Sequence, residues 1–147
     1  MESSAIVSMH LSEHGRHEAV LAEVAAADMV FASPIAEVEV RSRLARARYT
    51  DNPRRLRTDA EYDRVRTAFI EDWRRRRYFR IRLARPLLES ASFLVEKHRL
   101  RGYDGIHLAS LVTLTPMLPE VAISTWDREL AAAAVAEGFS LAHEVTN

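Results

Sequence analysis

The sequence predicts an α/β domain in which helices cover a short, mostly parallel sheet. Short apolar runs of strand length alternate with longer segments that have helical periodicity. Start signals separate the two kinds of segment, such as Ser33-Pro34 and the capping-box pattern of Thr58 and Glu61. Strands that are connected through helices favour parallel pairing. A chain of 147 residues has the size of one domain, so residues 1–147 are predicted to fold as a single unit.

Several predicted helices begin or end at a residue that favours that position. Pro34 and Pro86 suit the first turn of a helix, and Gly138 suits the position just after one. Asp127 is placed to cap the last helix. With approximate bounds, we expect helices over residues 3–14, 15–27, 34–49, 58–77, 86–100, 102–115 and 127–137, with loops at 50–57 and 117–120.

Four short runs are predicted as strands, at residues 29–33, 78–83, 121–125 and 139–142. The runs at 29–33 and 121–125 are continuously apolar, which is typical of buried strands. The run at 78–83 alternates, which predicts one polar face. In parallel sheets, sites form beyond the carboxyl ends of the strands, so we expect a site near Glu39 and Asp127.

The composition excludes some classes of protein and site. The chain has no Cys, which excludes disulfides and thiolate metal sites. No apolar run reaches membrane-spanning length, and no signal peptide is recognisable. We therefore expect a cytoplasmic protein that does not associate with membranes.

A net charge of zero conceals an uneven distribution along the chain. The segment from Arg41 to Arg85 has 16 Arg and 6 acidic residues, whereas the rest has 5 basic and 15 acidic residues. Arg binds phosphates in a bidentate manner and stacks on bases, so this segment is compatible with nucleic-acid binding. It is equally compatible with helices whose charges pair within the molecule. The sequence leaves both interpretations open.

Three acidic residues, Glu39, Asp104 and Asp127, lie at or near the predicted starts of helices. Each has a simple explanation, because an acid in this position stabilises a helix by about 0.5–1 kcal/mol. Together they favour another interpretation. Carboxylate oxygens are the ligands that suit Mg²⁺ or Mn²⁺, and such ions activate water for phosphodiester cleavage. His107 shares a helix face with Asp104, but a helical His more often packs or forms hydrogen bonds, so it is not predicted as a ligand.

Four local sequence strings resemble those of a known family. They are E-S-S-A-I-V at residues 2–7, V-E-V-R-S-R-L at 38–44, Y-D-G-I-H-L-A at 103–109 and S-T-W-D-R-E-L at 124–130. In order and spacing they resemble the PIN-domain ribonucleases, in particular the VapC-type toxin of type II toxin–antitoxin pairs. The resemblance extends over nearly the whole chain. It implies a three-layer α/β/α fold and a Mg²⁺- or Mn²⁺-dependent endoribonuclease that leaves a 5′-phosphate and a 3′-hydroxyl.

The resemblance also implies roles for individual residues and partners. The family's four metal-binding acids fall on Glu2, Glu39, Asp104 and Asp127, and the last three are the expected catalytic residues. Ser4, Thr125 and Arg41 are expected to contact the substrate. The implied partners are an RNA substrate, for which tRNA is one candidate, a cognate antitoxin protein and a second copy of the chain in a homodimer.

The chain departs from the family at its first string. There the family has an Asp at the end of a central strand of about five apolar residues, whereas only Met1 precedes Glu2. In the family's strand order, this strand would lie between the runs at 29–33 and 121–125. Either the natural chain starts further upstream or the strand and the first ligand are lost. Both explanations predict low stability and weak nuclease activity for this chain alone.

Two other functions therefore remain as alternatives. The first is a degenerate or truncated PIN-like domain that binds RNA or an antitoxin without cleaving. The second is a basic nucleic-acid-binding regulator whose acidic residues only cap helices.

Overall fold

The computed structural model describes residues 1–11, 15–49, 56–75, 78–118 and 120–145. In this part the chain forms seven helices and four strands of two residues each, which confirms a mixed α/β fold that is mostly helical. The elements are α1 (Ser3–His10), α2 (Arg16–Ala26), β1 (Phe31–Ala32), α3 (Ala36–Tyr49), α4 (Asp59–Arg74), β2 (Phe79–Arg80), α5 (Arg85–His98), α6 (Gly102–Leu114), β3 (Ala122–Ile123), α7 (Arg128–Ala136) and β4 (Ser140–Leu141).

Local cap signals place most of the helix starts where the sequence predicts them. Thr58 and Glu61 form both bonds of the capping box ahead of α4, and Asp127 caps α7. The prediction for α3 was wrong by two residues, because Pro34 lies in a turn and the helix begins at Ala36. α4 ends at Arg74 rather than Arg77. Part of the loop predicted at 50–57 and part of the helix break near residue 14 lie outside the described residues.

The strands pair in parallel, as predicted, but they form two small sheets. β1 pairs with β2 and β3 pairs with β4. Each predicted run of four to six residues contributes only two residues to a strand. A single sheet covered by helices in three layers is therefore not seen in the described part of the chain. Isolated pairs of strands are marginal on their own, so the helices supply most of the packing.

The two sheets lie on either side of a cavity of about 500 Å³. Its walls include residues 28–31 beside β1, residues 120–122 and 124 beside β3, and Met1. The amino group of Met1 donates a hydrogen bond of 2.7 Å to the carbonyl oxygen of Phe31. The backbone N–H of Glu2 donates one of 2.9 Å to Ser124. Two consecutive residues thus connect the sheets, at the place where the family resemblance predicts a central strand.

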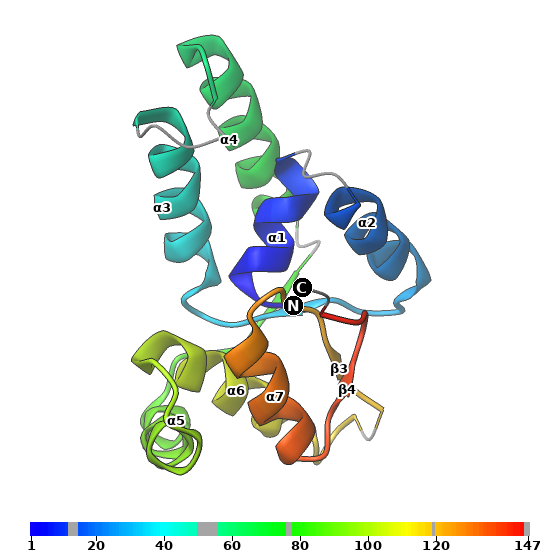
Figure 1. Cartoon of the computed structure of the whole chain (residues 1–147), viewed down its shortest axis with the longest axis vertical. Coiled ribbons are helices and arrows are strands. Elements are labelled where there is room, and N and C mark those ends of the chain that lie inside the picture. Colours follow the sequence, from blue (N-terminus) through cyan, green and yellow to red (C-terminus); the bar gives the residue numbers. More distant parts are fainter. Residues whose placement is uncertain (12–14, 50–55, 76–77, 119, 146–147) are drawn as a thin grey trace.

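The apolar core consists of two clusters, one in each half of the chain. In Figure 1, α1 to α4 lie in one half of the molecule, and α5 to α7 lie in the other. The first cluster joins α1, α2, α3 and α4, with Ile6, Leu44 and Phe69 fully buried. The second joins α5, α6, α7 and β3, with Leu108 and Leu130 fully buried. Contacts of Glu2 and Glu39 from the first half with residues of the second half connect the two.

Many arginines of the basic segment are paired with acids nearby, which supports the second interpretation of the charge pattern for those residues. The pairs are mostly exposed, so each contributes little to stability. They are Arg41–Glu37, Arg48–Asp59, Arg66–Asp63, Arg75–Glu71 and Arg85–Glu89. Among the described residues, no helix is both long enough and apolar enough to cross a membrane.

Candidate metal centre

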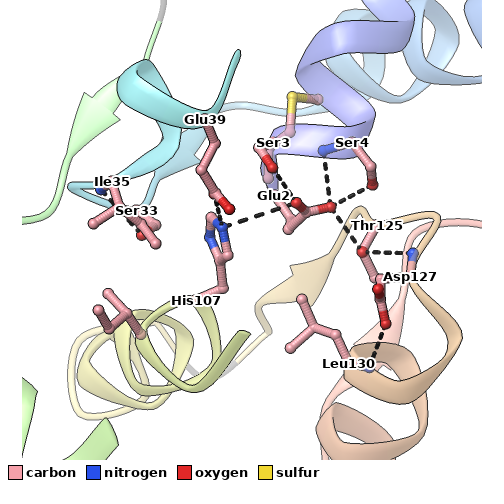
Figure 2. A network of polar contacts seen from close by, with 12 residues as sticks. Glu2, Ser3, Ser4, Ser33, Ile35, Glu39, His107, Thr125, Asp127 and Leu130 are labelled. Carbon is pink, nitrogen blue, oxygen red and sulfur yellow. Dashed lines mark hydrogen bonds and ion pairs between the residues drawn. The ribbon is translucent and has the colours of Figure 1, made fainter. Parts of the chain in front are cut away.

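The carboxylate of Glu2 is buried and held in place by several donors. Glu2 precedes α1 in an extended conformation, and its side chain caps the helix by accepting 2.9 Å from the N–H of Ser4. The hydroxyls of Ser3 and Ser4 also donate to it, and Thr125 Oγ1 donates at 3.0 Å (Figure 2). These donors point one carboxylate toward the space between α1, α3 and α6.

The electrostatic surroundings favour the charged form of Glu2. Burial alone would raise the pKa of its carboxyl. His107 and the hydrogen bonds from Ser3 and Ser4 outweigh this effect, so the pKa is lowered. A carboxyl that stays ionised in a buried position is well suited to bind a cation.

Glu39 and His107 approach Glu2 from two other helices. The first turn of α3 directs Glu39 toward α6, where His107 Nε2 lies 2.6 Å from Glu39 Oε2. The same nitrogen lies 3.8 Å from Glu2 Oε1. Figure 2 shows the Glu39 side chain and the imidazole pointing toward each other, with Glu2 beside them. Three residues that are far apart in sequence therefore meet at one point.

The position of α6 depends on a close contact with α5. A Cβ atom on Gly105 would lie 2.2 Å from Cγ2 of Val95 and 3.1 Å from the carbonyl oxygen of Ala91. Only glycine allows this approach of the two helices. Because Gly105 lies between Asp104 and His107, the contact fixes the end of α6 that carries both side chains.

Asp104 lies near the other acids and is affected by them. It is half-buried in the first turn of α6, and its pKa is raised from 3.8 to about 6. The largest cause is burial, followed by the negative charge of Asp127; Glu2 and Glu39 add to the increase and His107 opposes it. A carboxyl whose pKa is raised by several nearby acids is a feature of functional sites.

Asp127 caps the start of a helix, which is the structural role predicted for it from the sequence. Its Oδ1 accepts a hydrogen bond of 3.0 Å from the N–H of Leu130 and so caps α7. Its own N–H donates 3.1 Å to Thr125 Oγ1. The cap and its influence on Asp104 are compatible, since a carboxylate has a second oxygen.

The three residues expected to contact substrate have partners within the protein. Ser4 Oγ donates to Glu2 and accepts 2.9 Å from the N–H of Trp126, while Thr125 is buried against Glu2. Arg41 forms an exposed ion pair of 2.7 Å with Glu37. Ser4 and Thr125 thus position Glu2, and substrate contact by the three residues stays a prediction.

Glu2, Glu39 and His107 form a group that could hold a metal ion. One ligand atom from each residue lies within 4.8 Å of the other two. Among the described residues, this is the group with a geometry that could hold a metal ion. Asp104 and Asp127, which were also predicted as ligands, lie next to this group but do not belong to it. The sequence strings predict the two Glu residues as ligands but not His107, although the spacing of His107 from Asp104 places both on one helix face.

Comparisons of the chain with family models, with characterised proteins and with solved structures found no match.

Proposed function

We propose that this chain is a metal-dependent endoribonuclease that acts as the toxin of a toxin–antitoxin pair. The observation that carries the proposal is the convergence of Glu2, Glu39 and His107, with Asp104 beside them, from segments far apart in the sequence. Glu39 lies in the first turn of α3, but its carboxylate contacts His107, and stabilisation of the helix start does not account for that contact. The two carboxylates and the imidazole of Glu2, Glu39 and His107 are donors that suit a divalent ion.

The site needs a cation before it can accept a nucleic-acid backbone. Glu2, Glu39, Asp104 and Asp127 bring carboxyl groups to one place, and phosphates would be repelled by them. Glu2 and Glu39 would hold the ion, with Asp104 and Asp127 at its border. When bound, a divalent ion supplies charge to a phosphodiester oxygen and lowers the pKa of a water.

Asp104 is the residue best suited to move a proton. Without a bound ion its pKa is raised to about 6, close to neutral pH, and a divalent ion beside it would lower that pKa. Proton transfer is most effective when the pKa lies near the working pH. In the proposed reaction the Asp104 carboxylate would accept a proton from the attacking water. The water oxygen would bond to phosphorus as the bond from phosphorus to the 3′-oxygen breaks, and the 3′-oxygen would take a proton from solvent.

RNA as substrate and an antitoxin as partner are supported by the four sequence strings and by the basic segment from Arg41 to Arg85. The excess of Arg there would attract a phosphate backbone. A tRNA target and a homodimer belong to the same proposal.

The proposal is tested by RNA cleavage with Mg²⁺, with Mn²⁺ and with a chelator. We expect ion-dependent cleavage that falls at least about 100-fold in Asp104→Asn. Glu96→Gln is the matched control, because Glu96 is an exposed acid on α5. RNA binding without cleavage would instead favour the degenerate domain. Nucleic-acid binding that is indifferent to both the ion and Asp104→Asn would favour the basic regulator.

A further inference from the structure

We infer that His107 is itself a ligand of the divalent ion, and that the site therefore prefers Mn²⁺ or Co²⁺ to Mg²⁺. The inference rests on the proposed metal centre but not on the cleavage of RNA. It assigns to His107 a role that the acids of the site do not supply, namely a nitrogen donor.

One nitrogen of the imidazole reaches both carboxylates, as expected of a third ligand of one ion. Its Nε2 lies 2.6 Å from Glu39 Oε2 and 3.8 Å from Glu2 Oε1. Atoms that bind one ion at about 2.1 Å, at right angles to each other, stand about 3 Å apart. A supporting residue would contact a carboxylate from its far side, whereas this nitrogen faces the space between both carboxylates (Figure 2).

Because the group is buried, water has little access to the position where His107 Nε2 would bind the ion. The side chains of His107 and Glu2 are only 2% and 4% exposed, and that of Glu39 is 18% exposed. An ion among these three groups has little access to water on the His107 side. Two carboxylates and one imidazole would therefore make up that part of its coordination.

The backbone holds the imidazole in this position. His107 lies two residues after Gly105, where α6 approaches α5 so closely that a Cβ atom would meet Val95 at 2.2 Å. A helix held this closely cannot readily rotate to remove His107 from the group.

The mixed donor set determines the expected ion. Mg²⁺ takes oxygen ligands almost exclusively, whereas imidazole nitrogen favours later first-row ions. For an all-carboxylate site, the sequence predicts Mg²⁺ or Mn²⁺. The nitrogen of His107 shifts this expectation toward Mn²⁺ and Co²⁺.

A rival explanation makes the opposite prediction. If His107 carries a proton and serves as a positive partner for Glu2 and Glu39, it takes the place of an ion. An ion would then have to displace that charge, so removing His107 would strengthen ion binding. A ligand and a competing charge can thus be distinguished by the sign of one effect.

The test is titration calorimetry of the purified chain with Mg²⁺, Mn²⁺ and Co²⁺, without RNA. We expect Mn²⁺ and Co²⁺ to bind more tightly than Mg²⁺. His107→Gln, which offers an oxygen instead, should weaken Co²⁺ and Mn²⁺ binding at least about 10-fold and Mg²⁺ binding much less. The visible absorption of bound Co²⁺ should change in the same variant. His98→Gln, which alters a half-buried His paired with Glu137, is the control and should bind as the parent does.

Three results would overturn the inference. They are Mg²⁺ binding as tight as that of Mn²⁺, equal or tighter ion binding by His107→Gln, and no ion binding by the parent chain. Circular dichroism of the variant separates lost binding from lost folding. Ion binding as expected, together with no RNA cleavage, would reject the proposed function and leave this inference standing.

Discussion

Thr125 Oγ1 donates a hydrogen bond of 3.0 Å to the carboxylate of Glu2, across 123 residues of sequence. Thr125 follows β3 in the second half of the chain, and Glu2 precedes α1 in the first. The bond therefore connects the two halves at the candidate site. It also means that the site and the packing of the halves depend on the same few atoms.

Thr125→Val should show this dependence. Valine has a similar shape but cannot donate, so the buried carboxylate and the N–H of Asp127 each lose a partner. We expect the free energy of unfolding to fall by about 1–3 kcal/mol and Mn²⁺ affinity to fall by about 10-fold. Urea denaturation and calorimetry measure the two effects. Thr113→Val on the exposed side of α6 is the control, and equal behaviour of the two variants would contradict the prediction.

Asp104 should reduce stability at neutral pH. Its pKa is raised from 3.8 to about 6, so the folded protein holds this proton more tightly than the unfolded chain does. The stabilisation by that proton is present at low pH and is lost as the pH rises through about 6.

Asp104→Asn, without metal, should therefore be more stable than the parent at pH 7.5. After allowance for the half-exposed position, the gain is about 1 kcal/mol. It should shrink as the pH falls toward 4, which urea denaturation at several pH values measures. A gain that stays the same at low pH, or a loss at pH 7.5, would show that burial and the nearby acids do not raise the pKa of Asp104.

Gly105→Ala should disturb both packing and the site. The added Cβ would lie 2.2 Å from Val95 Cγ2, so α6 or α5 must shift. Overpacking of this kind costs about 1–3 kcal/mol, partly offset by the higher helix propensity of Ala. We expect a lower melting temperature and weaker ion binding. Gly102→Ala is a suitable control, because nothing lies within 4 Å of its Cβ position.

A strand placed before Met1 should stabilise the chain. The amino group of Met1 is buried beside Phe31, and burial lowers its pKa to about 6, with Glu2 and Glu23 opposing this shift. In an extended chain this group would be a neutral peptide N–H. Because Met1 lines the cavity between β1 and β3, the added residues would begin at the wall of that cavity.

About five apolar residues added before Met1 should raise the melting temperature by at least about 4 °C. The amide protons next to the cavity should also exchange more slowly. An added segment of the same length with a central Pro is the control, because Pro cannot donate in a sheet. If both segments act alike, the cavity does not accept a strand.

Local signals explain which parts of the structure the sequence could predict. The capping box of Thr58 and Glu61 and the cap by Asp127 depend on neighbours within a few residues, and both are present. Strand length was overestimated because pairing depends on distant partners. Within the described ranges, the apolar runs around Phe31 and Ile123 each pair with a single strand, β2 and β4 respectively.

In the candidate site, too, the sequence predicts local relationships but not contacts between distant residues. The spacing of residues on helices predicted that Asp104 and His107 share a face. The contact of His107 with Glu39 joins residues 68 positions apart, which no local pattern reveals. The fixed position of Glu2 likewise depends on Thr125.

The most direct test of the proposed metal-dependent nuclease compares two acids of α3 that lie two residues apart. Glu39 contacts His107 in the site, whereas Glu37 pairs with Arg41 on the surface. The measurement is the rate of RNA cleavage at a fixed Mn²⁺ concentration for Glu39→Gln, Glu37→Gln and the parent. We predict a loss of at least about 100-fold for Glu39→Gln and a rate near that of the parent for Glu37→Gln. Equal rates for the two variants, or no ion-dependent cleavage by the parent, would contradict the account.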